Sequence, residues 1–299
     1  MQNDIFGTRI RSVGIAAPAS GCDPEKLNSG IRVLEQNGIR VIPGKNLFRR
    51  GIFSYLSADD SLRAEDFNRL AEDPEVDAIF CVRGGYGTPR ILEQIRYDIL
   101  RQRNLPVIGF SDITALHLAM CSCNAGICVA SQMAARLPEA VNDTATLAGM
   151  KRVYARLSGE SVPGMVSPLS CCNEQKTSVS GGIMPLNLTL ASALCGTDFM
   201  PSMKGKIVVL EEIGEPVRKI DRMLWQLRAS GFFKEVSAVI FAQFSDCGEV
   251  EERENLLADF AGKADYPVFS GFPYGHDLPS VSCIFNEPCK VENGMFSFV

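Results

Sequence analysis

Ser111 is the residue of this chain whose setting first suggests nucleophilic chemistry. It stands in VIGFSDITALHLAM, residues 107–120, where an apolar run turns at Gly-Phe-Ser-Asp and continues with helical spacing. Gly109 lies two residues before the serine, as in a nucleophile elbow, but Ile113 occupies the position where an elbow usually has a second glycine. A Ser-Asp pair is also an ordinary helix start, because its side-chain oxygens accept bonds from the first backbone N–H groups. The segment alone leaves both interpretations open, a helix cap and a nucleophile.

A serine nucleophile needs a base, and the sequence has two histidines. His117 lies inside the apolar helix that would follow Ser111, and we interpret it as a packed helix residue. His276 stands in SGFPYGHDLPS, a Gly/Pro-rich loop after an apolar strand. Most loop histidines are ordinary surface residues, yet His276 is the one good candidate for the base if the chain has a serine triad.

The third member of a triad is an acid that orients the imidazole. The segment KIVVLEEIGE ends an apolar strand with Glu211 and Glu212. A carboxylate there is costly to bury without a partner. The pair is therefore either a solvated strand end or the source of the acid, and the chain order of the triad would be Ser, Glu, His.

A glycine-rich run follows another apolar strand, in CVRGGYGTPR. Gly84, Gly85 and Gly87 allow a sharp turn and a close approach of backbone N–H groups to a ligand. The run matches neither a P-loop nor the dinucleotide fingerprint, so it does not support nucleotide binding. A flexible turn and an anion or oxyanion cradle both remain open.

These candidates follow strands of an alternating strand–helix pattern, which predicts a parallel sheet covered on both faces. Ligands of such sheets bind beyond the carboxyl ends of the strands, where the candidates stand. The pattern lapses in a Ser/Pro/Cys-rich stretch and resumes after it. We expect a first α/β domain, a linker and a second domain, at residues 1–157, 158–180 and 181–299.

Composition excludes several classes of protein. The chain has 299 residues, 46% of them hydrophobic, and a formal net charge of −5, which argues against a nucleic-acid partner. The N-terminus lacks the pattern of a signal peptide, and no apolar run reaches the roughly 18 residues of a membrane span. We expect a cytoplasmic protein without a membrane partner.

The cysteines number eleven. In a long chain without an export signal, free thiols are expected rather than a disulfide framework. Cys121, Cys123 and Cys128 are clustered, but their spacing is not that of a structural zinc site. We predict no metal, and keep a thiol or metal enzyme using this cluster as an alternative.

Four segments, in order and with matching spacing, resemble the LD-carboxypeptidase family of serine peptidases, which includes murein tetrapeptide carboxypeptidases and microcin-immunity peptidases. They are VRGGYGTPRIL, GFSDITAL, VVLEEIGEPVRKIDRMLWQL and GFPYGH, and the early IAAPAS is similar to the family's first strand and loop. The resemblance implies an α/β fold with an N-terminal parallel-sheet, flavodoxin-like domain and a smaller, β-rich α/β C-terminal domain. It also implies an active site between the domains, so that their docking would assemble it.

Catalytic roles follow from the resemblance. It implies Ser111 as nucleophile, His276 as general base and Glu211 as the acid that orients His276. It further implies an oxyanion hole made by the backbone N–H groups of Gly85 and Asp112, and no cofactor. An N–H that follows a nucleophile at a helix start is a preorganised donor for a developing oxyanion, so the physical chemistry agrees.

Substrate-binding candidates are Arg83, Gly84, Tyr86, Asn187 and Arg222. Gly84 and Tyr86 belong to the glycine-rich segment, and the two arginines are cations that could pair with a substrate carboxylate.

The chain departs from the family where relatives usually read G-x-x-G-G-N-L. Here the segment is GIMPLNL, residues 182–188, which keeps Asn187 but loses the paired glycines. If those glycines line the substrate cleft, Pro185 and Leu186 would stiffen and narrow it. Lys219 also stands where many members have arginine.

The resemblance implies a cytoplasmic serine carboxypeptidase that removes terminal D-Ala from murein tetrapeptide in peptidoglycan recycling, with a muropeptide as its small peptide partner and a homodimer as its assembly. An immunity-type peptidase that cleaves a peptidyl-nucleotide antibiotic is one alternative. Such relatives typically carry extra aromatic residues that stack a base, whereas for Trp225, the single tryptophan, we expect packing. A non-catalytic binding protein, with Ser111 only a helix cap, is the other.

Overall fold

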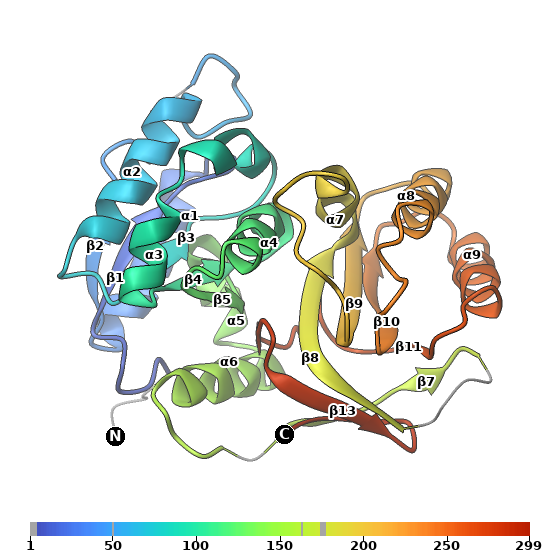
Figure 1. The fold of residues 1–299 in the computed structure, drawn as a ribbon. Coiled ribbons are helices and arrows are strands. Elements are labelled where there is room, and N and C mark those ends of the chain that lie inside the picture. Colours follow the sequence, from blue (N-terminus) through green and yellow to red (C-terminus); the bar gives the residue numbers. More distant parts are fainter. Residues whose placement is uncertain (1–4, 50, 163, 174–177) are drawn as a thin grey trace. The chain divides into compact units, whose positions relative to one another are not determined.

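The computed structural model describes residues 5–49, 51–162, 164–173 and 178–299. The chain divides into two compact units, unit 1 (Met1–Val162) and unit 2 (Pro163–Val299), and each contains its own sheet (Figure 1). Short strands β6 (Val166–Pro168) and β7 (Ser170–Cys171) of unit 2 fall within the stretch that we predict as a linker.

Unit 1 is built on a parallel sheet. Its strands lie in the order β5, β4, β3, β1, β2, and every neighbouring pair of these runs parallel. This is the flavodoxin-like order, so the predicted fold of the first domain is confirmed. Strands β1, β3 and β4 are buried along their whole length, as expected where helices cover both faces. The bounds are β1 Ser12–Ala16, β2 Arg40–Pro43, β3 Ala78–Cys81, β4 Pro106–Gly109 and β5 Ile127–Ala130.

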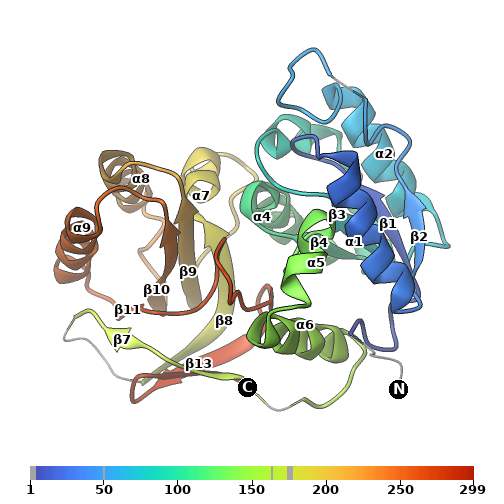
Figure 2. The same cartoon turned by 180° about the vertical axis from the view of Figure 1, so that it is seen from behind.

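Helices cover both faces of this sheet: α2 and α3 lie in front of it in Figure 1, and α1 lies in front in the reverse view of Figure 2. Local sequence explains where they begin. The side chain of Asp23, for example, accepts bonds from the N–H groups of Glu25 and Lys26, and Pro24 fits the first turn. The bounds are α1 Pro24–Gln36, α2 Asp60–Glu72, α3 Tyr97–Arg103, α4 Thr114–Ser122, α5 Leu137–Ala140 and α6 Thr144–Leu157, with 3-10 turns η1 Thr88–Gln94, η2 Ser111–Ile113 and η3 Ala134–Arg136.

The carboxyl ends of the parallel strands carry the candidate residues of unit 1. The segment after β1 contains Ser20, the segment after β3 contains Gly84 and Gly85, and Ser111 follows β4. The chain winds outward from β1 to β2 and then returns to place β3 on the other side of β1. The topological switch point of the sheet therefore lies between β1 and β3, beside these segments.

Unit 2 contains an 8-stranded mixed sheet in the order β6, β14, β13, β8, β9, β10, β11, β7. Strands β8, β9, β10 and β11 run parallel to one another, and the remaining pairs, β8 with β13 and β11 with β7 included, are antiparallel. The predicted β-rich α/β character of the second domain is confirmed. The bounds are β8 Ser178–Asn187, β9 Lys206–Ile213, β10 Ala238–Ser245, β11 Val268–Ser270, β13 Pro288–Glu292 and β14 Met295–Phe298. Unit 2 also contains the short strand β12 Cys283–Ile284, which is not part of this sheet, and helices α7 Leu188–Leu194, α8 Val217–Ala229 and α9 Val250–Gly262.

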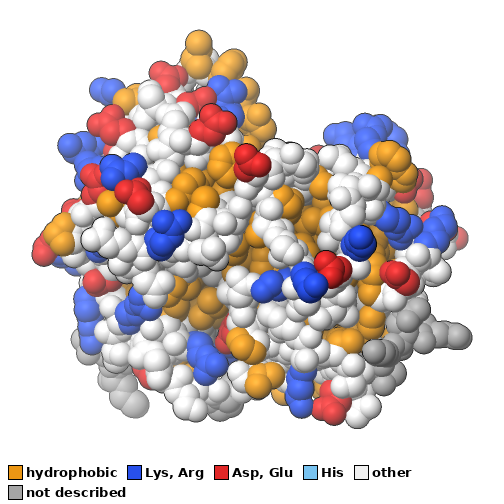
Figure 3. Space-filling model, viewed as in Figure 1, with side chains coloured by type: hydrophobic (Ala, Val, Ile, Leu, Met, Phe, Trp, Pro, Cys, Tyr) orange, Lys and Arg blue, Asp and Glu red, His pale blue; other side chains and the backbone are white. Residues whose placement is uncertain are grey.

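The charged side chains at the surface and the length of the helices can be compared with what a membrane or nucleic-acid partner requires. The face drawn in Figure 3 carries Lys and Arg side chains interspersed with Asp and Glu side chains. Among the residues that the structure describes, no helix has both the length and the apolar character needed to cross a bilayer.

Candidate active site

Ser111 occupies a strained turn between β4 and α4. Its φ of 62° lies in the left-handed region, which is rare for a residue with a side chain. Such a conformation costs about 1–3 kcal/mol and concentrates at functional sites, and it is the geometry of a nucleophile elbow. The N-cap residues of η2 and α4 are Phe110 and Ile113, so Ser111 is not the cap of either helix.

Gly109 explains how the elbow forms without its second glycine. A Cβ on Gly109 would lie 2.9 Å from both Cγ atoms of Ile113. The side chain of Ile113 therefore fills the space that the first glycine leaves, and the turn needs one glycine rather than two.

The glycine-rich segment after β3 lies against Ser111. A Cβ on Gly84 would be 2.9 Å from both Cβ and Oγ of Ser111, and 3.2 Å from the backbone nitrogen of Asp112. Gly85 has a φ of +106°, and a Cβ there would clash with Ser20 Oγ. Ser20 Oγ in turn accepts a bond of 3.0 Å from the N–H of Tyr86. Unit 1 thus brings the predicted nucleophile and the predicted oxyanion segment together, and only glycine fits the two contact points.

The carboxyl group of Asp112 ties these two turns to each other. It is buried and accepts a bond of 2.8 Å from the N–H of Thr88, at the end of the glycine-rich segment. Burial raises the pKa of Asp112, and the bonds from Thr88 offset part of that rise. The sequence analysis used only the backbone N–H of this residue, and nothing in the sequence identified the partner of its side chain.

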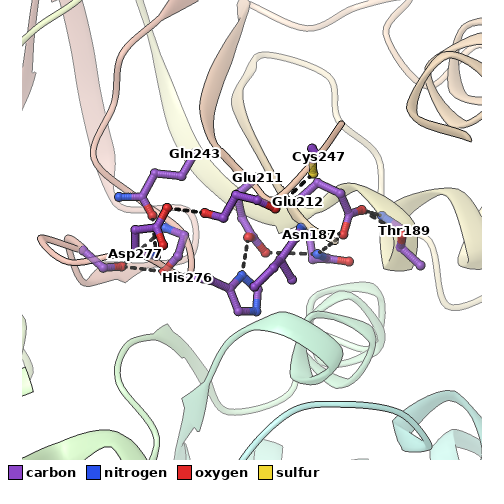
Figure 4. Close-up of polar contacts among 12 residues, drawn as sticks. Asn187, Thr189, Glu211, Glu212, Gln243, Cys247, His276 and Asp277 are labelled. Carbon is purple, nitrogen blue, oxygen red and sulfur yellow. Dashed lines mark hydrogen bonds and ion pairs between the residues drawn. The ribbon is translucent and has the colours of Figure 1, made fainter. Parts of the chain in front are cut away.

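Unit 2 supplies an acid–imidazole pair. His276 Nδ1 lies 2.8 Å from Glu211 Oε2 (Figure 4). The Glu211 side chain is 0% exposed and that of His276 is 14% exposed. A buried carboxylate on Nδ1 fixes the tautomer and the orientation of an imidazole, as the acid of a catalytic triad does.

Asn187 holds the carboxyl groups of Glu211 and Glu212 side by side. The parallel register of β8 and β9 places Asn187 opposite Glu211. Its Nδ2 donates bonds of 3.1 Å to Glu211 Oε1 and to Glu212 Oε1, and its Oδ1 accepts from the N–H of Leu190 at the start of α7 (Figure 4). The structure thus places the amide of this predicted substrate-binding residue on the acid of the pair.

Glu212 is a functional candidate to which the sequence assigned no role of its own. Its Oε2 accepts from the backbone N–H and the hydroxyl of Thr189, at 2.8 and 2.7 Å. Burial raises the pKa of Glu212, and the bonds from Thr189 oppose this rise. The Glu-Glu pair was visible in the sequence, but the Asn187 bridge depends on the register of two strands that lie apart in the chain.

The loop that carries His276 is anchored to β10. Gln243 donates from Nε2 to the carbonyl of Pro279 at 2.9 Å and accepts from the N–H of Asp277 at 2.9 Å (Figure 4). Ser245 Oγ donates to the Asp277 carboxylate. Gly275 has a φ of +148°, and a Cβ there would meet Gln243 Oε1 at 2.7 Å. The glycine before the histidine is therefore required by this anchor.

Two other predictions have different outcomes. His117 is fully buried with Nε2 3.0 Å from the carbonyl of Val107, and burial lowers the pKa of His117 to about 4, so its role as a packed residue is confirmed. Trp225 is 68% exposed on α8, so the expected packing of this ring is wrong. The helix is amphipathic, and its buried face is formed by other positions such as Leu224 and Leu227.

Of the remaining candidates, Arg83, Tyr86 and Arg222 are exposed. Pro185 and Leu186 lie in β8 and are buried in the core of unit 2. The pairing of β8 with β13 ends at Gly182, before Pro185, so the proline interrupts no bond to that strand.

The cysteine cluster contains one close pair, with 3.8 Å between Cys121 Sγ and Cys128 Sγ. Among the residues with a described structure, no group of three or more His, Cys, Asp or Glu side chains is arranged to hold a metal ion.

Comparison with known proteins finds two family models. The model of the LD-carboxypeptidase N-terminal domain matches residues 13–131, and that of the LD-carboxypeptidase C-terminal domain matches residues 180–291.

Similar proteins match over almost the whole chain. A Bacillus subtilis protein named a probable murein peptide carboxypeptidase is 32% identical, over 91% of this chain and 85% of its own length. The murein tetrapeptide carboxypeptidase of Pseudomonas aeruginosa is 29% identical, over 88% and 87%. The microcin C7 self-immunity protein of Escherichia coli is 24% identical, over 92% and 88%. The crystal structure of a muramoyltetrapeptide carboxypeptidase from Oxalobacter formigenes has the same fold, with a TM-score of 0.82, 23% identity and coverage of 96% and 97%.

Proposed function

The chain belongs to the LD-carboxypeptidase family and is a carboxypeptidase hydrolase, and on this premise we propose that it hydrolyses an L,D peptide bond in a murein tetrapeptide and releases the terminal D-Ala. The observation that carries the proposal is the pair of Glu211 and His276, because a fully buried carboxylate 2.8 Å from Nδ1 assigns the role of base to the other ring nitrogen. The strained turn at Ser111 supports the role of Ser111 as the nucleophile.

In the proposed reaction the Ser111 hydroxyl attacks the carbonyl carbon of the scissile bond while His276 Nε2 takes its proton. The N–H groups of Gly85 and Asp112 donate to the oxyanion of the tetrahedral intermediate. His276 then protonates the amine of D-Ala as the C–N bond breaks, which leaves an acyl-enzyme. Water, activated by the same imidazole, hydrolyses the ester and returns the proton to Ser111. Glu211 stabilises the imidazolium in both halves of the cycle.

The first experiment incubates the purified protein with L-Ala-γ-D-Glu-meso-diaminopimelate-D-Ala and follows D-Ala release by mass spectrometry. We expect release by the wild type, and a loss of at least about 1,000-fold in Ser111→Ala and in His276→Ala, as for other triads. Ser29→Ala, at a half-buried serine of α1, is the matched control and should retain full activity. A tetrapeptide that ends in L-Ala should not be cleaved.

A serine-reactive phosphonate separates this peptidase from a binding protein on the same scaffold. The wild type should be labelled at Ser111, and His276→Ala should not, because the hydroxyl then lacks a base. Absence of labelling together with absence of D-Ala release would contradict the proposal.

A second candidate is a peptidase of the immunity type that cleaves a peptidyl-nucleotide. The exposed ring of Trp225 favours it, since an exposed aromatic face can stack a base. Hydrolysis of an aminoacyl sulfamoyl adenosine that is lost in Trp225→Ala, with murein tetrapeptide left intact, would support this candidate over the first. A cytoplasmic location and a homodimer stay predictions.

A further inference from the structure

Unit 1 contains a cavity of about 580 Å³ at the topological switch point of its sheet. Its walls come from the segments that follow β1, β2 and β3, and they include Ser20, Cys22, Arg49, Ser54, Tyr55 and Arg83. Ligands of open parallel sheets bind in the crevice beyond the strand ends at this point, and cavities of about 300–1,000 Å³ hold small organic ligands. The cavity is far larger than a terminal alanine requires.

The cavity and the nucleophile turn share one wall. Arg83 lines the cavity, the next residue Gly84 lies against Ser111, and Gly85 lies against Ser20, which again lines the cavity. A chain bound at Ser111 therefore needs to pass only the two glycines to enter the cavity. Because the leaving group is a single small residue, the part of the substrate that is long enough to do so is the acyl part.

The charge of the cavity is positive. Among the described residues that line it, Arg49 and Arg83 carry charge and no side chain is acidic. Within the described part of the chain, neither guanidinium is in an ion pair with a carboxylate, and Arg83 Nη1 lies 3.5 Å from the carbonyl of Gly21. Guanidinium groups bind carboxylates through paired, charge-assisted bonds, so these side chains are suited to an acidic ligand.

Exposed aromatic rings border the same cavity. Tyr55 is 48% exposed and stacks on Phe53 with ring centroids 5.4 Å apart. Its ring also makes an edge contact with Tyr86, with 5.6 Å between the ring centroids. The segment between β2 and α2, which contains Phe53 and Tyr55, forms the top of unit 1 in Figure 1, and Figure 3 shows hydrophobic side chains at the surface there. The rings offer apolar faces for the aliphatic part of a bound chain.

We propose that this cavity is the subsite for the acyl part of an acidic peptide, with Arg83 as the residue that selects a carboxylate and Arg49 as a supporting cation. The assignment rests on the proposed function, because it takes the acyl part of that substrate as the ligand. It names a specificity that the triad itself does not provide, since the triad acts on the scissile bond alone.

Binding is measured in the Ser111→Ala protein, which cannot turn over substrate. The probes are the tripeptide L-Ala-γ-D-Glu-meso-diaminopimelate and the same tripeptide with the glutamate α-carboxylate and the side-chain carboxylate of diaminopimelate amidated, titrated by calorimetry. We expect Arg83→Gln to weaken the acidic tripeptide at least 10-fold and the amidated one less than 2-fold. Arg49→Gln should weaken the acidic tripeptide about 3-fold. Arg40→Gln, an exposed arginine of unit 1 outside the cavity, is the matched control and should change neither affinity.

Two results would overturn the subsite. One is equal weakening of both tripeptides by Arg83→Gln, which indicates a general structural effect, and the other is an acidic tripeptide that does not bind. The proposed reaction fails separately, if the wild type releases no D-Ala. Arg83-dependent binding without D-Ala release would support the subsite and contradict the proposed reaction. D-Ala release without Arg83-dependent binding would support the reaction and contradict the subsite.

Discussion

A single added methyl group at Gly84 tests the contact between the glycine-rich segment and the nucleophile. In Gly84→Ala the new Cβ would lie 2.9 Å from Ser111 Oγ, which is too close, so one of the two turns must shift. We expect kcat for D-Ala release to fall about 100-fold, because displacements near 1 Å at reacting groups have effects of that size. Overpacking should lower the free energy of unfolding by about 1–3 kcal/mol.

Gly262→Ala is the control for this variant. Nothing lies within 4 Å of a Cβ at Gly262, in the last turn of α9. That substitution should leave kcat unchanged and stabilise the helix by about 0.5–1 kcal/mol. Full activity in Gly84→Ala would show that the two turns do not need their close approach.

Substitution of Asn187 tests whether this residue positions the Glu211 carboxylate or binds substrate. Its amide donates to the Glu211 and Glu212 carboxylates, so Asn187→Ala should lower kcat about 10- to 100-fold with little change in KM. The variant also loses the cap of α7, which should cost about 1 kcal/mol in the free energy of unfolding. Asp143→Ala removes the equivalent cap of α6 and should show that cost without the loss of kcat. A raised KM with unchanged kcat would restore the role predicted from the sequence.

At the scale of elements, β10 holds the loop of the predicted base. Gln243→Ala removes the two bonds that the Gln243 side chain makes to this loop, while leaving Glu211 and His276 in place. We expect kcat to fall about 10-fold and amide exchange in residues 271–282 to accelerate. Gln226 is a matched control, since it makes two similar bonds with Ser192 between α8 and α7. Gln226→Ala should affect stability, and an equal loss of kcat there would argue against a specific role for the loop anchor.

Periodicity predicts the buried elements well. The apolar run in VDAIFCVRGG predicts a buried strand, and PEKLNSGIRVLEQNG predicts an amphipathic helix that stops at Gly38. The structure has β3 and α1 within these segments. The segment TPRILEQI predicts a helix, but the structure has the 3-10 turn η1 there, because short helical segments often tighten to the 3-10 form. Helices α3 and α6 were not predicted individually, since neither follows a distinct strand signal.

Some residues of the candidate site are likewise predicted by local sequence, whereas others are placed by contacts between distant segments. Ser111, Glu211 and His276 are predicted from their segments, and the structure of unit 2 places Glu211 Oε2 2.8 Å from His276 Nδ1. The Asn187 bridge and the Gln243 anchor join strands and loops that are distant in sequence, so no local pattern encodes them. Long-range register, which is set by the packing of the whole sheet, decides such contacts.

For the whole molecule, buried ionisable groups make stability depend on pH in opposite directions. Burial raises the pKa values of Asp112 and Glu212, so their protonated forms favour the folded state, and the stability that they confer falls as pH rises through their raised pKa values. His117 acts in the other sense. The pKa of His117 is lowered from 6.5 to about 4, so the unfolded chain binds its proton first as the solution is acidified.

The contribution of His117 can be isolated with His117→Gln, which does not titrate and keeps an N–H group for the carbonyl of Val107. The histidine contributes its full stability above pH 6.5 and loses it as the pH falls to 4. This difference between the pKa of His117 in the unfolded chain and in the folded protein corresponds to about 3 kcal/mol in the free energy of unfolding. We therefore expect urea unfolding of the wild type to lose about 3 kcal/mol more than the variant between pH 7.5 and 4, because Asp112 and Glu212 titrate in both proteins and cancel in the difference. Stability curves that run parallel over this range would mean that His117 is protonated in the folded protein as readily as in the unfolded chain.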